Sequence, residues 1–348
     1  KHYSEWLSIW SELNLTQSQK GQTIHEGYNS MVGRATNNAT RNHQAQLNDV
    51  STGETKQNDD NDNDSDKDSD KTYYVPLRFW FNRNPGLALP IIALQYHEVK
   101  IKMTFRPLSS LIKATDDNNA IVSITDETNL TTSSGGVINL KNSSLWVDYI
   151  YLDTDERRRF AQVSHEYLIE QLQEHRTTIN SETANISLNF NHPVKEIVWV
   201  FVKDDKSVEG FGPTNGSGNS MLDFEANTIA NQNENFPLNH FKTATLKLNG
   251  HDRFELRDAS YFNLAQPLQH HTCAPERKIY VYSFALKPEE HQPSGTCNFS
   301  RIDNSQLELT GVRVSNVNIA NNLKLKVFAV NYNILRIMSG MGGLAYSN

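Results

Sequence analysis

The sequence has little of several things that mark common protein classes. It holds two cysteines in 348 residues, too few for a disulfide framework. No apolar run approaches the roughly 20 residues that span a bilayer. The 33 lysines and arginines are outnumbered by 40 aspartates and glutamates, which argues against a general nucleic-acid binder. At 37% hydrophobic residues, the chain still has enough apolar material for folded cores, and its length suits two domains.

Motifs that would indicate an enzyme are also missing. The glycine-containing stretch 210–213 has a proline where a phosphate-binding loop needs N–H donors, and the one at 340–343 has no helix after it. No G-x-S-x-G nucleophile elbow occurs. The carboxylates of Glu289 and Glu290 lie in a proline-rich loop, where a solvated pair is favoured over an acid–base couple. We therefore expect no catalytic residue and no cofactor.

The densest group of metal-ligand residues lies in the last third of the chain. It consists of His270, His271, Cys273, His291 and Cys297. Zinc can use two histidines and two thiolates, but the spacing fits none of the usual ribbons or fingers. These five residues are weak candidates for a metal site, and an ordinary polar loop is the favoured interpretation. The two cysteines are most simply reduced thiols, with a single bridge between them as the alternative.

One segment holds almost all of the net charge of -7. Residues 36–72 contain almost no large apolar side chain, and seven aspartates stand against one lysine between residues 58 and 70. Self-repulsion and the lack of anything to bury predict a solvated loop insertion at 36–72. Asp60 begins a D-x-D-x-D pattern, but Ser65 and Lys71 stand where a calcium loop needs glycine and glutamate. A specific calcium site is therefore disfavoured.

Loops also contain the candidate modification sites. Sequons of the N-x-S/T kind occur in expected loops at Asn38, Asn129 and Asn215. An asparagine-rich chain produces some sequons by chance. These three are the candidates for glycan attachment if the chain meets a glycosylating machinery.

The remaining sequence is dominated by short β-prone segments. Asn249-Gly250 favours a type I′ hairpin turn, because both residues accept a positive φ. Short helices are expected at 4–13, with Ser4 as N-cap, at 27–32 and at 153–160. Strands are expected at 73–81, 94–105, 144–152, 166–172, 184–190, 196–202, 242–248, 251–256, 278–286, 296–302, 306–314 and 323–338. Many short strands separated by turn signals predict an all-β sandwich or barrel.

Four stretches resemble one known family, the major capsid proteins of nucleocytoplasmic large DNA viruses, in the style of the mimivirus and large algal virus branches. Residues 76–99 are similar to the family signature and read PLRFWFNRNPGLALPIIALQYHEV. Residues 146–161, WVDYIYLDTDERRRFA, look like the connector between the family's two jelly rolls. Residues 189–199, NFNHPVKEIVW, resemble an early hairpin of the second jelly roll, and 331–348 resemble the family's C-terminus.

The resemblance implies an all-β double jelly roll, that is, two eight-stranded antiparallel β-sandwiches with short helices in the connections. Residues 1–152 would be the first jelly roll, with the acidic loop insertion at 36–72. The family's N-terminal arm and first strands are absent before the helix at 4–13, so this first sandwich would be incomplete, and the chain is interpreted as a fragment of a longer protein. Residues 153–163 would be the connecting helix and residues 164–348 the second jelly roll.

The resemblance also implies a function in assembly without catalysis. Three chains would form a homotrimer, a capsomer with a pseudo-hexagonal outline, in the shell of a large icosahedral virion assembled in the host cytoplasm. Its partners would be neighbouring capsomers and minor capsid proteins, with no direct contact with nucleic acid and only an indirect one with an inner membrane. Two alternatives stay open: a carbohydrate-binding β-sandwich like a lectin, and a jelly-roll metalloenzyme that uses the histidines named above.

Overall fold

The structure is a computed structural model of the chain. The residues that it describes are 1–20, 27–32, 73–105, 114–115, 121–122, 143–202, 224, 239–275, 277–312 and 323–346. None of the helices among these residues is long and apolar enough to cross a membrane. The acidic block at 58–70 and the candidate glycan sites Asn38, Asn129 and Asn215 lie outside the described residues.

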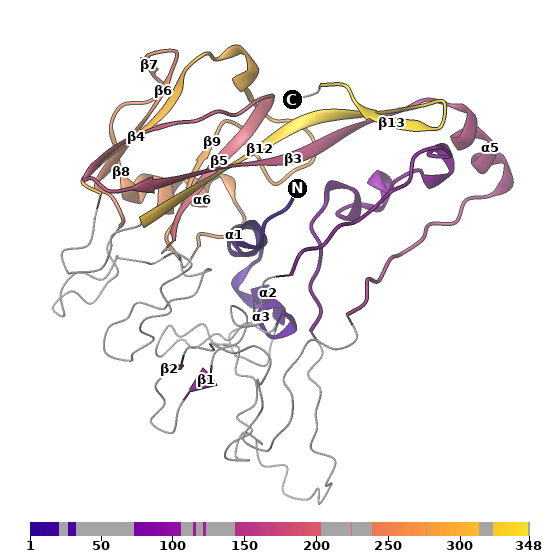
Figure 1. Cartoon of the computed structure of the whole chain (residues 1–348), viewed down its shortest axis with the longest axis horizontal. Helices are drawn as coiled ribbons and strands as arrows, with labels where there is room; N and C mark the ends of the chain where they lie inside the picture. The colour runs from indigo at the N-terminus through magenta and orange to yellow at the C-terminus, as the bar shows by residue number, and fades with distance from the viewer. Residues whose placement is uncertain are drawn as a thin grey trace, which may run out of the picture.

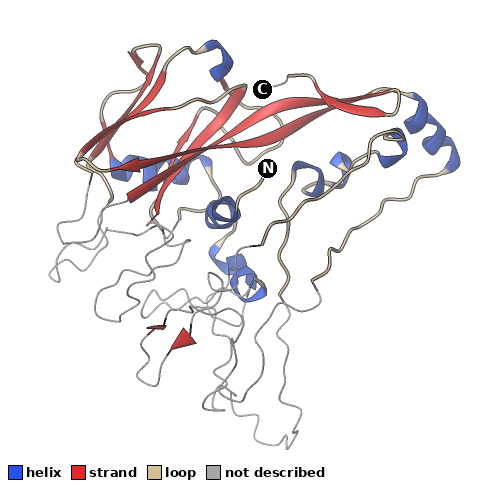
Figure 2. Ribbon diagram, in the orientation of Figure 1, coloured by secondary structure: helices blue, strands red, loops and turns tan. Residues whose placement is uncertain are grey.

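Two antiparallel sheets form a sandwich from the second half of the chain (Figures 1 and 2). The larger sheet contains β3 (His165–Ile179), β5 (Pro193–Val202), β9 (Ile279–Ser283), β10 (Cys297–Asn298), β12 (Leu323–Met338) and β13 (Met341–Leu344). The smaller sheet contains β4 (Thr183–Ser187), β6 (Thr243–Leu248), β7 (His251–Asp252), β8 (Arg257–Asp258) and β11 (Ser305–Thr310). The chain passes repeatedly from one sheet to the other, which gives the sandwich its jelly-roll topology.

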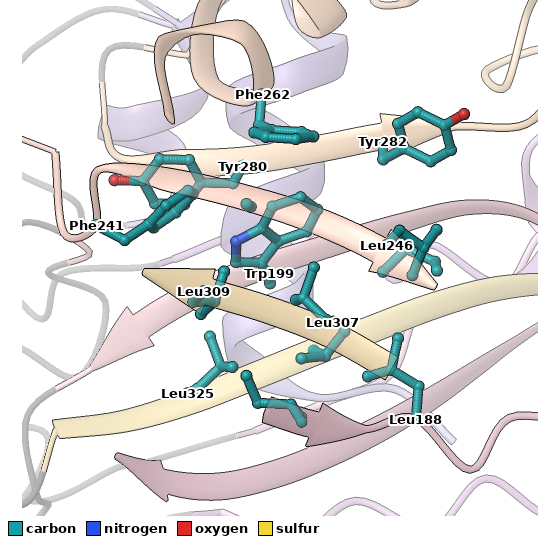
Figure 3. Close-up of a cluster of buried hydrophobic side chains, with 14 of the residues drawn as sticks. Leu188, Trp199, Phe241, Leu246, Phe262, Tyr280, Tyr282, Leu307, Leu309 and Leu325 are labelled. Atoms are coloured by element: carbon teal, nitrogen blue, oxygen red, sulfur yellow. The ribbon is translucent and has the colours of Figure 1, made fainter. Parts of the chain in front are cut away.

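The core of the sandwich lies between the two sheets. Trp199 of β5 is 1% exposed and packs against Phe262 and Tyr280, with ring centroids 5.2 and 6.0 Å away. Figure 3 shows these rings beside Leu246, Leu307 and Leu309 from the facing sheet and Leu325 from β12 of the same sheet. Side chains of a strand alternate between its two faces, so β5 also presents a second apolar row on the outer face of the larger sheet.

Strands β3 and β12 are long enough to extend beyond the sandwich as an arm (Figure 1). Their pairing runs from Ile179 opposite Leu323 to His165 opposite Ile337. At the far end of the arm, β12 turns back into β13. Ser339 and Gly340 form this turn with φ values of 51° and 81°, the positive values that a tight hairpin requires. The prediction for 323–338 is confirmed to the residue, whereas β13 was not predicted.

The expected helices are confirmed in position. They are α1 (Ser4–Asn14), α3 (Gly27–Met31) and α5 (Thr154–Gln162). Two further short helices, α2 (Gln17–Lys20) and α6 (Gln266–His270), were not predicted. The expected N-cap is wrong: Tyr3 occupies that position, and the Ser4 hydroxyl donates to Glu5 instead. Helix α5 has its N-cap at Asp153, whose carboxylate accepts from the Thr154 N–H, and none of its residues is buried.

The three strands expected in the first half of the chain are wrong. Segments 94–105 and 144–152 carry no ladder, and the first of them begins with a turn at residues 95–96. A strand is held by backbone hydrogen bonds to a neighbour, and no strand lies beside either segment in the described ranges. The first jelly roll over 1–152 therefore stays a prediction, because the described part of that half contains only the two-residue strands β1 (Ala114–Thr115) and β2 (Ile121–Val122).

Prolines shape the region around the third expected strand, at 73–81. Three short 3₁₀ turns, η1 (Trp80–Asn82), η2 (Pro85–Leu87) and η3 (Ile91–Ala93), follow one another there. Proline lacks the N–H that a ladder needs; Pro76 lies within the expected strand, and Pro85 and Pro90 stand at the start of η2 and just before η3. The aromatic run at 73–81 therefore ends in a turn, although its β propensity favoured a strand.

In the second half, the expected strands differ mainly in length. The hairpin at Asn249-Gly250 is confirmed, with φ values of 51° and 81°. The strand expected at 251–256 shortens to β7, and 296–302 divides into β10 and a 3₁₀ turn, η5 (Phe299–Arg301). Strand β8 and the π-helical turn η4 (Tyr261–Ala265) before α6 were not predicted.

Candidate functional site

The outer face of the larger sheet is the surface on which the two halves of the chain meet. Its centre is a β-bulge in β5, where Val330 of β12 pairs with Glu196 and Asn331 pairs with Val194, so Lys195 is an extra residue. Val194 and Ile197 point into the core of the sandwich. The bulge therefore places Lys195 and Glu196 side by side on the outer face, both of them buried.

Helix α1 covers the apolar part of this face. Trp6, Ile9 and Leu13 are all less than 5% exposed and pack on the outer row of β5 and on Phe328 of β12. The Trp6 and Phe328 rings lie 5.6 Å apart. Burying each such side chain stabilises the docked helix by about 1.5–3 kcal/mol as an upper estimate.

Buried ion pairs fix the orientation of α1. The Lys326 ammonium lies 2.6 Å from the Glu5 carboxylate, and both side chains are almost fully buried. At the other end of the helix, Glu12 lies 3.2 Å from Lys20 and 3.6 Å from Arg277. Charges are costly to bury unless they are paired, so the Glu5–Lys326 pair selects one position of the helix on the sheet, while the Glu12 pairs tie its other end to α2 and to Arg277.

A second ion-pair cluster joins the proline-rich region to the same face. Glu170 of β3 binds Arg83 at 2.6 Å through one oxygen and Lys195 at 2.8 Å through the other. Lys195 also lies 5.5 Å from the ring centre of Tyr332. Burial, with Glu170 and Glu196 close by, raises the pKa of Tyr332. Through Glu170, the buried lysine of the bulge is thus linked to Arg83 in the first half of the chain.

The turn of the arm receives a third contact. The Tyr96 N–H donates to the Gly340 carbonyl at 2.9 Å. A Cβ at Gly340 would lie 2.5 Å from the Tyr96 ring, so only glycine allows this approach. Next to it, Ala93 and Leu94 pack with Ile337 in a small buried cluster.

The two extended segments of the first half leave large apolar side chains in contact with solvent. Every residue from 95 to 105 and from 143 to 151 is exposed. Trp146 is 86% and Tyr151 92% exposed. Soluble monomers rarely expose apolar surface on this scale, and such surface is typical of a site that another chain segment covers.

The five candidate metal ligands do not come together. His271 is buried between two carboxylates, with Nε2 3.1 Å from Glu196 Oε2 and Nδ1 3.1 Å from Glu289 Oε1. His270 contacts the Leu286 carbonyl instead, 3.0 Å from its Nδ1. Among the described residues, which include all five candidates, there is no group of three or more His, Cys, Asp or Glu side chains that could hold a metal ion.

The two cysteines are separate thiols. Cys273 lies 3.7 Å from the Lys20 ammonium, and its N–H donates to the Leu13 carbonyl at 2.9 Å. Cys297 is in β10, and burial raises the pKa of its thiol. The alternative of a bridge between them is therefore wrong for this structure.

Sequence reasoning missed the buried charges of the outer face. The signal was present in β5, whose sequence PVKEIVWVFV carries a lysine and a glutamate at the start of an apolar run. It was present again in β12, where Lys326 interrupts an apolar strand. A charge within a strand that is buried on both faces requires a partner from elsewhere, but the sequence does not say which residue supplies it.

Two family models match the chain, one after the other. The model described as "Major capsid protein N-terminus" matches residues 1–153. The model described as "Large eukaryotic DNA virus major capsid protein" matches residues 156–343. The two matches meet at helix α5, which begins at Thr154.

Relatives and solved structures agree with these models. The major capsid protein of Pyramimonas orientalis virus is 43% identical over 371 aligned residues, which cover 100% of this chain and 73% of that protein. The major capsid protein of Paramecium bursaria Chlorella virus 1 is 43% identical over 314 residues, which cover 80% and 67%. A quasi-atomic model of the PBCV-1 virus capsid matches with a TM-score of 0.56 and 36% identity, over 79% of this chain and 70% of that chain.

Proposed function

Because the chain belongs to the major capsid proteins of large eukaryotic DNA viruses, we propose that three copies of it associate into a pseudo-hexagonal capsomer. The chain is a structural protein of the virion shell with the jelly-roll fold of that family. Two sandwiches in each of three chains would give six similar units around one axis, which tile a flat facet while only three chains need to close. Neighbouring capsomers and minor capsid proteins are the further partners that we propose, with assembly in the host cytoplasm.

The observation that carries the proposal is the exposed apolar surface of residues 95–105 and 143–151. Extended segments with open backbone groups and large apolar side chains are stabilised when another strand pairs with them. We propose that they become strands of the first jelly roll, residues 1–152, when they are covered in the assembled capsomer. Residues 153–163 would connect this domain to the second jelly roll at 164–348.

The proposed mechanism is assembly without catalysis or cofactor. The buried ion pairs of the outer face join the N-terminal half to the second sandwich, and a subunit held in one shape can form interfaces that are largely pre-formed. No observation on the described residues favours a lectin or a metalloenzyme, since the five candidate ligands lie apart. The acidic residues at 58–70 are proposed to decorate the outer surface, and Asn38, Asn129 and Asn215 stay candidates for glycans.

The native mass of the purified chain tests the trimer. Light scattering on a size-exclusion column at about 10 μM should give three times the chain mass of 39.6 kDa. A monomer under these conditions would contradict the proposal. Metal analysis of the same sample tests the metalloenzyme alternative, because a stoichiometric transition metal would favour it.

A further inference from the structure

The triad formed by Glu196, His271 and Glu289, here called the His271 clasp, connects three parts of the sandwich. Glu196 lies in β5, His271 directly follows α6, and Glu289 lies in the loop between β9 and β10. The His271 side chain is 2% exposed, and each of its ring nitrogens lies 3.1 Å from a carboxylate oxygen. The contact with Glu289 is a hydrogen bond, whereas the contact with Glu196 is an ion pair with poorer alignment.

This geometry requires the charged form of the histidine. A carboxylate only accepts hydrogen bonds, and a neutral imidazole has one N–H for two such neighbours. The imidazolium has two N–H groups, one toward each carboxylate, and its charge also stabilises the ion pair with Glu196. Burial alone would lower the pKa of His271, but the contacts with Glu196 and Glu289 raise it to about 9. The contacts with His271 lower the pKa of both carboxyls, although burial acts against this.

The other charged groups near the clasp act on its carboxylates and not on the His271 ring. Lys195 and Arg83 act on Glu196 from β5 and from the proline-rich region, and both lower its pKa. Glu289 also accepts from the Thr272 N–H at 2.8 Å and from the Thr272 hydroxyl. Deprotonation of His271 would therefore weaken its contacts with both carboxylates, while Glu196 keeps its interactions with Lys195 and Arg83 and Glu289 keeps its hydrogen bonds from Thr272.

The clasp also supports the docking of helix α1. Two residues after His271, the Cys273 N–H donates to the Leu13 carbonyl of that helix. The Cys273 sulfur lies 3.7 Å from Lys20, which itself binds Glu12. Residues 271–273 thus touch the loop that carries Glu289 on one side and the N-terminal helix on the other.

We propose that the His271 clasp is an alkali-sensitive latch, which holds segment 271–290 and the docked helix α1 while the imidazolium persists and releases them when it loses its proton. The latch is intrinsic to one chain and does not depend on the trimer. The folded pKa of His271 lies above its ordinary value of 6.5, so the stabilisation is complete below pH 6.5 and is lost as pH rises through about 9. At the acid end, protonation of the two carboxylates would open the same triad.

The test is the pH dependence of unfolding of the full chain, compared with His271→Gln. Urea titrations between pH 6.5 and 9.5 should show the folded-to-unfolded ratio of the wild type falling by up to about two orders of magnitude more than that of the variant. The matched control is His270→Gln, because this neighbouring histidine contacts one backbone carbonyl and no carboxylate. Its pH profile should follow the wild type.

A second measurement keeps the test decisive if His271→Gln does not fold. The titration of the His271 ring in the wild type, followed by NMR, should have its midpoint near pH 9, with faster amide exchange at 271–290 and in α1 above that pH. A midpoint at or below 6.5, or equal alkaline loss of stability in the wild type and His271→Gln, would overturn the proposal. Stability loss without exposure of α1 would also overturn it, since the latch would then not hold the helix.

Discussion

Strand β5 and segment 144–152 carry sequences of the same kind and have opposite environments. Both are rich in β-branched and aromatic side chains, and each contains a tryptophan. Trp199 in β5 is 1% exposed, and Trp146 in the extended segment is 86% exposed. β5 pairs with β12 on one edge and with β9 on the other. The comparison teaches that burial of an apolar strand depends on the neighbours that satisfy its backbone, and not on its own composition.

The largest expected effect separates the two tryptophans directly. Trp199→Ala should lower the free energy of unfolding by about 3–5 kcal/mol, because it removes the ring at the centre of the core. Trp146→Ala should change it by less than about 0.5 kcal/mol in the isolated chain. Urea unfolding followed by far-UV circular dichroism measures both. Equal losses would mean that segment 144–152 is packed in solution and would break the comparison.

The next effect concerns the buried charges that join the two halves. Lys326→Met should cost about 3 kcal/mol, because it removes the cation 2.6 Å from the buried Glu5 carboxylate. The double variant Glu5→Leu with Lys326→Met should recover most of that loss, since no charge then stays buried at this site. Denaturant titration of the two variants gives the coupling. A double variant as unstable as the single one would show that the pair itself, and not the uncompensated charge, supports helix α1.

The smallest effect tests the contact between Tyr96 and the turn of the arm. Gly340→Ala should cost about 1–2 kcal/mol, because the backbone has a φ of 81° and the new methyl group meets the Tyr96 ring. Gly343→Ala is the control, since a Cβ there meets nothing within 4 Å. Thermal unfolding should separate the two. If both behave alike, neither the positive φ of the turn nor the contact with Tyr96 is present in solution.

Much of the second half could be predicted from sequence because its patterns agree with its contacts. The apolar, β-prone stretch at 323–338 and the Asn249-Gly250 turn are local signals, and the strand and the turn that they predict are both confirmed. The same signals are wrong in the first half, where proline removes donors and the extended segments find no partner strand in the described ranges. The β propensity of a segment shows that it can form a strand, but a strand forms only where a neighbouring strand pairs with it.

The charged residues of the outer face show the same limit for the site. His271 was a weak candidate for a metal ligand, on the basis of its neighbours in sequence. Its neighbours in space are Glu196 and Glu289, 75 residues before it and 18 after it. They face different nitrogens of one ring, so they form an ion-pair triad where a metal would need ligands that converge.

The amino-acid sequence by itself determined the all-β class, the family and the boundaries of the long strand at 323–338, because these depend on local pattern and on motifs that are continuous in the chain. Only the tertiary structure decided that Lys195 and Glu196 share one face, that Glu5 meets Lys326, and that His271 lies between two carboxylates. Each of these depends on a bulge or on a contact between distant segments. The free energy of a buried charge is set by the partner that reaches it through space, and one-dimensional spacing does not contain that partner.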